Sequence, residues 1–281
     1  MAPRSRSPPR PEARLAVGDP RARIHVAAVG FEVERVVEPI VRDRADRAYL
    51  LTRAGRDDAA PFVEEVHRRL VRAGAAIEVR IVRTELWDVF RALAAYREIF
   101  DAEGRTDRSA AATVPIRVNV STGTKITAIA GTLACMLWRG EPYYVRVSRS
   151  WYSDRTPEVA SVRDEIASVE PVGVYELRRP APELIEVLEA LERRGGTLRK
   201  HELLRELGLD GPTAAGSPRS PQAQHGHLRR RLEPLERRWG FVRLDPGGPR
   251  GRVHLTEQGR VALVLFGRHR TGAEYSIDKR V

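Results

Sequence analysis

Short apolar runs alternate with amphipathic segments between residues 24 and 148, and this alternation limits the fold more than any other feature. Strand-length apolar runs occur at 24–30, 48–52, 76–82, 116–120 and 142–148. Helical apolar spacing occupies the segments 32–44, 60–74, 86–104 and 125–138. Strict alternation of strand and helix produces a mostly parallel sheet with helices on both faces. We therefore predict an α/β domain over residues 23–177.

The turn 121–124, Ser-Thr-Gly-Thr, joins the strand at 116–120 to a long apolar helix that begins near Lys125. The first N–H groups of a helix are unpaired, and the helix dipole adds about half a positive charge there. Lys125 is one of three lysines in the chain, against 46 arginines. Hydroxyls and one lysine at a helix N-terminus are typical of a phosphate site. Alternatively, Ser121 or Thr122 simply caps the helix, and Gly123 simply permits a tight turn.

Ligands of such sheets bind outside the carboxyl ends of the strands, where the strand order reverses. Two further turns follow strands at those ends: 30–35, Gly-Phe-Glu-Val-Glu-Arg, and Thr52–Arg53. Glu32 is unusual beside an anion. It accepts from a ribose hydroxyl or an adenine amine, or it pairs with Arg35, and the second alternative is slightly favoured.

The pattern changes after residue 177, where Arg178, Arg179, Pro180 and Pro182 mark a boundary. A helix over 183–196 precedes a second helix, which Thr197 caps and Gly208 ends. Ser220 caps a third helix that Pro234 bends. Two strands around a Gly/Pro/Arg tip and a closing helix complete residues 178–281. This order predicts a winged helix-turn-helix DNA-binding domain.

The positive charge is concentrated in this C-terminal part and in a tail. Residues 178–281 carry a net charge of +8 and residues 24–177 a net charge of −1, while residues 1–23 carry +4. A basic module beside a neutral one is typical of nucleic-acid binding. Residues 1–22 are rich in proline and arginine and are expected to be disordered.

The third helix and the hairpin tip contain the candidate contacts to double-stranded DNA. The N-terminal part of such a helix enters the major groove. Leu228 and Leu232 face the core, so the three neighbouring arginines cannot all face DNA. The candidates for base and phosphate contacts are Gln222, Gln224, His225, His227, Arg229, Arg230, Arg231, Arg250 and Arg252.

Other functional classes find little support in the sequence. No apolar run approaches the ~20 residues that span a bilayer, and residues 1–20 lack a signal-peptide core. A single cysteine, Cys135, excludes internal disulfides and indicates a reducing cytoplasm. The sequence has no G-x-G-x-x-G after the first strand, no P-loop and no metal spacing among its seven histidines. We therefore expect no metal and no cofactor.

The segment Asn-Val-Ser-Thr-Gly-Thr-Lys (119–125), together with the early turn, resembles the CARF domain, the Rossmann-like sensor of CRISPR-associated proteins. The 178–281 module is similar to the winged helix of CARF-type transcriptional regulators. The resemblance implies a homodimer that holds a cyclic oligoadenylate between two helix N-termini. The ligand-binding residues that it implies are Gly30, Phe31, Glu32, Arg35, Asn119, Ser121, Thr122, Gly123, Thr124 and Lys125. Members often have two successive glycines in this motif, whereas here Thr122 precedes the single Gly123.

The resemblance therefore implies a cyclic-oligoadenylate-responsive DNA-binding regulator linked to CRISPR defence. The alternative is a ring nuclease that cleaves the cyclic ligand, with Lys125 and Ser121 stabilising the transition state. The sequence shows no general base near the motif, which disfavours the enzyme. Trp151 and Tyr152, in an irregular stretch, pack over a ligand or a partner subunit, or on the protein's own surface.

Overall fold

The computed structural model describes residues 15–55, 57–73, 77–106, 114–149, 164–211, 220–267 and 277–278. The chain divides into two compact units: residues 1–177 with 274–281 form unit 1, and residues 178–273 form unit 2. Trp151 and Tyr152 lie outside the described residues. None of the described helices is both long and apolar enough to cross a bilayer.

Unit 1 is built on a seven-stranded sheet in the order β10-β3-β2-β1-β4-β5-β6. The four inner pairings, from β3 to β5, are parallel, and the outer pairings of β10 and β6 are antiparallel. The prediction of a mostly parallel α/β sheet is confirmed. The strands are β1 Ile24–Ala28, β2 Arg47–Arg53, β3 Glu78–Thr84, β4 Arg117–Asn119, β5 Glu141–Arg149, β6 Glu165–Pro171 and β10 Ile277–Asp278.

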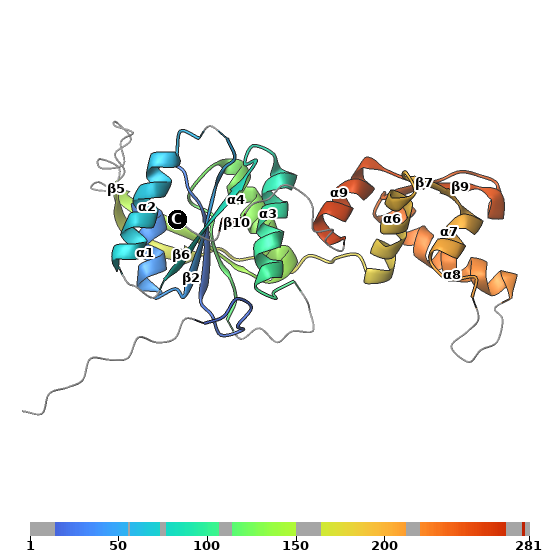
Figure 1. Ribbon diagram of the computed structural model, residues 1–281, viewed down its shortest axis with the longest axis horizontal. Coiled ribbons are helices and arrows are strands. Elements are labelled where there is room, and N and C mark those ends of the chain that lie inside the picture. The colour runs from blue at the N-terminus through green and yellow to red at the C-terminus, as the bar shows by residue number, and fades with distance from the viewer. Residues whose placement is uncertain are drawn as a thin grey trace, which may run out of the picture. The chain divides into compact units, whose positions relative to one another are not determined.

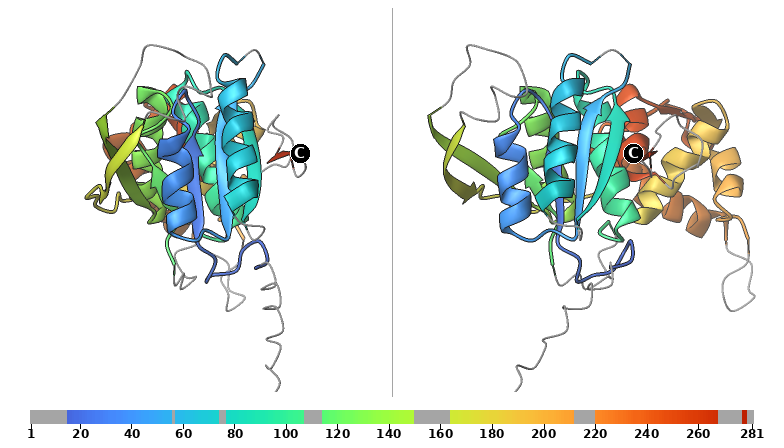
Figure 2. Two further views of the ribbon diagram at one scale, coloured as in Figure 1. Left: turned by 90° about the vertical axis from the view of Figure 1, so that its left-hand side faces the viewer. Right: turned by 60° about the vertical axis from the view of Figure 1, so that its left-hand side comes forward.

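Helices cover both faces of this sheet, as Figures 1 and 2 show. Helices α1 (Glu34–Arg42) and α2 (Ala60–Ala73) pack against one face through a core that includes Phe62. Helices α3 (Val89–Ala102) and α4 (Lys125–Trp138) cover the other face. Gly131 lets α4 approach closely, since a Cβ there would lie 3.0 Å from both Tyr96 of α3 and Val118 of β4.

The strand order places two connecting turns next to each other. The chain proceeds from β1 through β2 to β3 in one direction, and then returns to the other side of β1 with β4, β5 and β6. The order therefore reverses between β1 and β4, which pair in parallel from His25 and Arg117. The turns 29–33 and 120–124 leave these two strands at the same edge of the sheet, where ligands bind in folds of this type.

Residues 15–22 were expected to belong to a disordered tail, but they lie against unit 1. The carbonyl of Leu15 accepts from Arg47 Nη2 at 2.9 Å, and the N–H of Gly18 donates to Glu103 Oε2 at 3.0 Å. Arg105 donates to the carbonyls of residues 19 and 20. Composition alone failed here because the partners of these backbone groups lie more than 30 residues away in the chain. Residues 1–14 are outside the described ranges.

A buried histidine lies at the opposite edge of the sheet from those turns. The side chain of His25 is 1% exposed, and its Nδ1 lies 3.2 Å from the hydroxyl of Tyr143. Burial, with the charge of Arg117, lowers the pKa of His25 to about 3. The imidazole is therefore neutral at pH 7, and its approach to Asp43, 3.3 Å from Nε2, is not a charge–charge contact.

This histidine is expected to make unit 1 less stable in acid. The folded pKa is lower than the unfolded value of about 6.5, so the unfolded chain binds a proton more readily between pH 6.5 and pH 3. Stability falls as the pH falls through this window, by up to about 1.4 kcal/mol per pH unit from this group. Urea unfolding at pH 6, 5 and 4 gives the free energy of unfolding as a function of pH. For His25→Gln its slope should be smaller than that of the wild type by the equivalent of about one proton. The exposed His227→Gln serves as the control, and equal slopes for the wild type and His25→Gln would contradict the prediction.

Unit 2 combines four helices with a three-stranded antiparallel sheet in the order β7-β9-β8. Its buried side chains, including Leu188, Leu203 and Leu235, form one core. The elements in chain order are α6 Pro182–Arg193, β7 Thr197–Arg199, α7 Lys200–Glu206, α8 Pro221–Glu233, β8 Val242–Leu244, β9 Arg252–Leu255 and α9 Glu257–Phe266.

Two sequence predictions about unit 2 need correction and one is confirmed. Thr197 does not cap a helix but lies in β7, where its hydroxyl is 3.1 Å from His254 Nδ1. Pro234 does not lie inside a bent α8: the α-helix ends at Glu233, and Pro234 begins a wider, π-helical turn over 234–238, in which Trp239 N donates to the carbonyl of Pro234. Proline has no N–H to donate to the α8 carbonyl four residues earlier. Ser220 caps α8 as predicted, with its hydroxyl accepting from Ala223 N at 3.3 Å.

Candidate functional site

The turn before α4 requires glycine at position 123. Gly123 has φ +76°, a left-handed conformation that side chains disfavour. A Cβ there would lie 2.8 Å from both the Cβ of Ala28 and the Oγ1 of Thr127. The turn is therefore pressed against the end of β1, and it brings the N-terminus of α4 to the strand-order reversal.

Thr124 caps α4, so neither Ser121 nor Thr122 has that role. The N–H of Thr127 donates to Thr124 Oγ1 at 3.2 Å, and the N–H of Thr124 donates to Thr127 Oγ1 at 2.9 Å. This reciprocal capping box satisfies two N–H groups at the helix end, those of Thr124 and Thr127. The alternative interpretation of Ser121 or Thr122 as the helix cap is therefore wrong.

Asn119 ties the two neighbouring turns together. Its Nδ2 donates to the carbonyl of Arg35 at 2.9 Å, and its Oδ1 accepts from both the N–H and the hydroxyl of Ser121, at 2.9 and 2.6 Å. Asn119 is 1% exposed. These hydrogen bonds hold the turn before α4 against the start of α1, so Asn119 has a structural role in the candidate site.

Arg35 is buried and forms an ion pair with Asp164, with 3.0 Å between Nε and Oδ2. The slightly favoured pairing of Arg35 with Glu32 is not among the ion pairs of the described residues, although the charge of Arg35 acts to lower the pKa of Glu32. Sequence reasoning could not find this partner, because Asp164 lies 129 residues away along the chain. Arg35 thereby fastens the start of α1 to the residue that precedes β6.

Several polar groups of the two turns have no partner among the described residues. Thr122 is 2% exposed and its Oγ1 makes no hydrogen bond there, and the same holds for the buried Oε2 of Glu32. Lys125 is exposed at the start of α4. Gly30 lies beside this turn, since a Cβ on it would be 3.3 Å from Gly123 Cα. The site is therefore a polar, incompletely satisfied surface with one cation at its rim.

Phe31 is the aromatic member of the site. Phe31 is 39% exposed, and its ring packs edge-on against Phe62 of α2, with 5.1 Å between the ring centroids. The residue is thus held by α2 and remains partly exposed.

The third turn at this edge, Thr52–Arg53, borders a separate hollow of about 180 Å³ between β2, β3 and α2. Asp57 organises it: one carboxylate oxygen accepts from Thr52 Oγ1 at 2.5 Å and from Arg53 N at 3.1 Å. The other oxygen accepts from Ala59 N. These bonds close the turn on itself, so the Asp57 carboxylate has a structural role here.

The predicted DNA contacts on α8 differ in exposure. Gln222, His227, Arg229 and Arg230 are exposed, whereas Gln224 and His225 are half-buried. Arg231 turns inward, and its Nη1 lies 3.5 Å from Glu186 of α6. The expectation that the three arginines cannot all point outward is confirmed. Arg250 and Arg252 are exposed, in the connection between β8 and β9 and at the start of β9.

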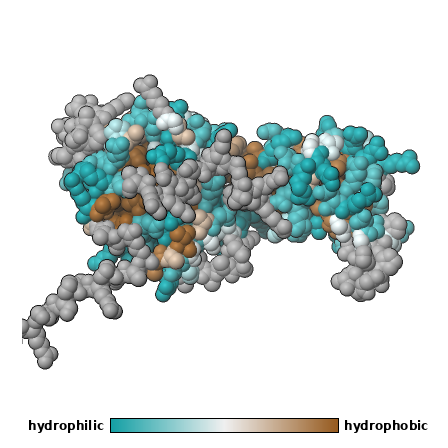
Figure 3. All heavy atoms as spheres, in the orientation of Figure 1, coloured by the Kyte–Doolittle hydropathy of each residue, from teal (hydrophilic) through white to brown (hydrophobic). Residues whose placement is uncertain are grey.

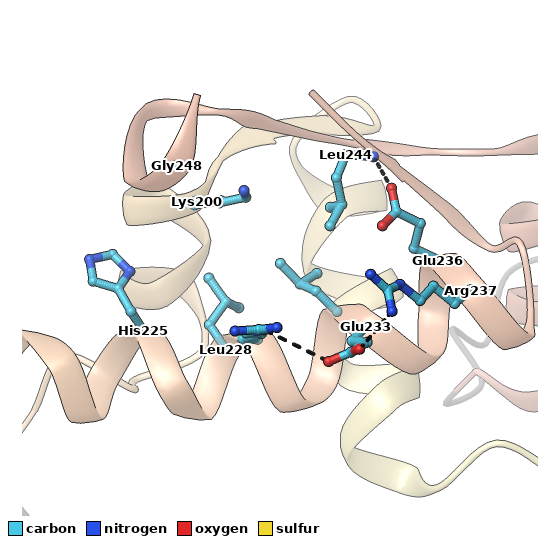
Figure 4. Close-up of a pocket in the computed structure, with 10 residues that line it drawn as sticks. Lys200, His225, Leu228, Glu233, Glu236, Arg237, Leu244 and Gly248 are labelled. Carbon is cyan, nitrogen blue, oxygen red and sulfur yellow. Dashed lines mark hydrogen bonds and ion pairs between the residues drawn. The ribbon is translucent and has the colours of Figure 1, made fainter. Parts of the chain in front are cut away.

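A hollow of about 360 Å³ lies between α8, the wide turn that follows it and the β8–β9 connection (Figure 4). Its apolar wall consists of Leu228, Leu232 and Leu244. Lys200, at the start of α7, points into it and forms no ion pair with any described residue. The sequence analysis did not single out Lys200, because it placed this residue inside a helix capped by Thr197. The available signal was that lysine is rare in this chain.

The two acidic side chains of this hollow are both engaged. Glu233 pairs with Arg237 at 3.2 Å and with Arg229 at 3.7 Å, and Glu236 accepts from the N–H of Leu244 at 3.0 Å. Figure 4 marks the pairing of Glu233 with Arg237. The lining has three basic side chains, Lys200, Arg229 and Arg237, so it remains positive overall. Among the described residues, no group of three or more His, Cys, Asp or Glu is placed to hold a metal ion.

Comparisons with known proteins found matches to parts of this chain. A protein-family model described as "HFX_2341_N:-like, N-terminal" matches residues 23–150. The uncharacterized protein MJ1513 of Methanocaldococcus jannaschii is 25% identical over 198 residues, which cover 62% of this chain and 57% of that protein. The match therefore spans little more than half of that relative.

Two solved structures are also similar to this chain. One is Enterococcus italicus Csm6 bound to cyclic hexa-2′-fluoro-hexa-dAMP, with a TM-score of 0.39, 12% identity and coverage of 76% of this chain and 55% of that chain. The other is Can2 from Sulfobacillus thermosulfidooxidans in complex with cyclic tetra-adenylate, with a TM-score of 0.36, 14% identity and coverage of 87% and 64%.

Proposed function

We propose that unit 1 is a CARF-type sensor for cyclic oligoadenylate and that unit 2 is a winged helix-turn-helix module. Together they would form a ligand-responsive transcriptional regulator linked to CRISPR defence. The observation that carries the proposal is the pair of turns at the strand-order reversal. There a glycine turn presents the N-terminus of α4, the exposed Lys125 and the unpartnered hydroxyl of Thr122. Such a surface suits a phosphate.

A cyclic ligand calls for a second copy of the chain. A ring of phosphates has rotational symmetry, which a two-fold dimer with two facing helix N-termini matches. Helix α4 offers a suitable surface: Ile129 is 55% exposed, and Ile126, Leu133 and Met136 are only half-buried on the same helical face. The face of the molecule in Figure 3 is mostly hydrophilic with local apolar patches. We propose that α4 contributes to a homodimer interface.

Binding to purified wild-type protein tests the sensor. Cyclic tri-, tetra- and hexa-adenylate are added in thermal-shift and calorimetric titrations, with linear oligoadenylate as the control. A ligand that binds only the folded protein raises its melting temperature. We expect one of the three cyclic oligoadenylates to raise the melting temperature and to bind with a stoichiometry of one ligand per two chains. No shift and no heat with any ring would reject the proposal.

Support for DNA binding comes from the order of elements in unit 2 and from its net charge of +8 over residues 178–281. Helix α8 corresponds to the recognition helix, and the β8–β9 connection corresponds to the wing. Lys200 adds a cation beside both. Ligand binding in unit 1 would alter DNA affinity if the two states of the dimer bind the ring unequally.

The wing arginines provide the test of this part. Arg252→Ala and Arg250→Ala are each expected to weaken binding to DNA of any sequence, because phosphate contacts carry no sequence information. Each should reduce the slope of log K against log salt by about one. Fluorescence anisotropy with a promoter fragment at several salt concentrations measures this slope. Arg193→Ala is the control, since Arg193 pairs with Glu206 on α6 and α7. If Arg250→Ala and Arg252→Ala had the same slope as the wild type, the wing would not be part of the DNA interface.

A ring nuclease is the second candidate function, and the structure supplies one observation in its favour. The carboxylate of Glu32 lies beside the α4 turn, where the sequence alone shows no general base. Incubation of labelled cyclic tetra-adenylate with the protein distinguishes the functions. Linear product after hours would favour the enzyme, and intact ring would favour the regulator.

A further inference from the structure

Glu32 is held between the two turns of the proposed ligand site. A Cβ on Gly30 would lie 2.6 Å from Glu32 Oε2 and 3.3 Å from the N and Cα of Gly123. Oε2 itself is buried and has no hydrogen-bond partner among the described residues. A buried carboxylate oxygen without a donor is costly, and native structures seldom retain one without a functional reason.

The charges around this carboxylate oppose one another. The charge of Arg35 favours the ionised form of Glu32, whereas that of Asp164, the ion-pair partner of Arg35, disfavours it. The N–H groups of Glu32 and Gly123 favour the ionised form, yet burial outweighs them and raises the pKa of Glu32. These N–H groups therefore serve the carboxylate only in part, because its Oε2, which lies beside the α4 turn, has no hydrogen-bond partner among the described residues.

We propose that Glu32 is a specificity-determining residue, which accepts a hydrogen bond from a hydroxyl or amino group that the ligand carries near its phosphates. This assignment rests on the proposed function of unit 1. A phosphodiester with its own donor satisfies Oε2 while Lys125 and the helix N-terminus hold the phosphate. A bare anion meets the same carboxylate as a repelling charge. The ligand class is thus a nucleotide phosphodiester that carries such a donor, rather than inorganic phosphate.

A thermodynamic cycle between protein and ligand tests the assignment. Wild type, Glu32→Ala and Glu32→Gln are titrated with three rings: cyclic tetra-adenylate, its 2′-deoxy analogue and its inosine analogue. The second ring lacks the 2′-hydroxyl and the third lacks the 6-amino group, so the two possible donors are separated. Hydrogen bonds to charged groups are worth about tenfold to a hundredfold in affinity.

We expect both Glu32 variants to lose affinity for cyclic tetra-adenylate by about tenfold or more, and to lose nothing on the ring that lacks the donor bound by Glu32. Glu34→Gln is the matched control, because burial also raises the pKa of Glu34 but Arg69 pairs with it at 2.6 Å. Equal losses on all three rings, or no loss on any, would overturn the assignment alone. Failure of the wild type to bind any ring would overturn it together with the proposed function.

Discussion

Lys125→Ala is expected to abolish measurable binding of cyclic oligoadenylate, with affinity at least about a hundredfold lower than that of the wild type. In the proposed dimer each ring meets two copies of this lysine, so the variant removes two charge-assisted contacts at once. Calorimetric titration with the ring that binds the wild type measures the loss. The unfolding midpoint without ligand should stay unchanged, because Lys125 is exposed and substitutions at such surface positions usually have small effects on stability.

Two variants make this result specific to the lysine at α4. Lys125→Arg keeps the charge and should retain part of the affinity, although a guanidinium does not replace an ammonium at every site. Lys200→Ala removes a lysine from unit 2 and should leave ring binding unchanged. Wild-type affinity in Lys125→Ala would place the anion elsewhere on the protein.

The sequence was sufficient to predict the parallel strands of the sheet and the turn at which the candidate site is proposed, but not the edge strand β10, which residues 277–278 add from the far end of the chain. Apolar runs such as 24–30 fixed the buried strands, and the Gly123 turn after β4 fixed one side of the strand-order reversal. Both signals are local, because each depends on residues within one strand and its following turn. The strand β7 escaped detection because only three residues, Thr197–Arg199, form it, and their pairing with β9 lies more than 50 residues away.

Long-range polar contacts explain why the details of the site could not be predicted. The sequence suggested that Arg35 pairs with its near neighbour Glu32, whereas the folded chain brings it to Asp164. Oε2 of Glu32 has no hydrogen-bond partner among the described residues, and this makes Glu32 the candidate specificity determinant. Likewise, the sequence could not show that Asn119, a predicted ligand-binding residue, also joins the two turns through its hydrogen bonds to Arg35 and Ser121.

A buried ionic network at the other edge of the sheet gives the largest expected effect on stability. The side chain of Arg47 is 1% exposed and donates to Glu103 at 2.7 Å and to Glu78 at 2.9 Å. Glu103 is fully buried and also accepts from the hydroxyl of Tyr49 at 2.6 Å. Arg47→Met leaves Glu103 as a buried charge without its counterion. We expect the free energy of unfolding of unit 1 to fall by about 3–5 kcal/mol.

The double variant Arg47→Met/Glu103→Gln shows whether the unpaired charge is the cause. An amide at position 103 still accepts from Tyr49 but carries no charge, so the double variant should be more stable than Arg47→Met alone. Urea unfolding of both, beside the exposed control Arg146→Met, measures the coupling; the control should cost at most about 1 kcal/mol. If the stability losses of the single variants Arg47→Met and Glu103→Gln added up to that of the double variant, the network would owe its stability to packing of the arginine stem rather than to charge.

Because Arg47 also binds the carbonyl of Leu15, Arg47→Met should in addition expose residues 15–22 to proteolysis before the rest of unit 1 unfolds.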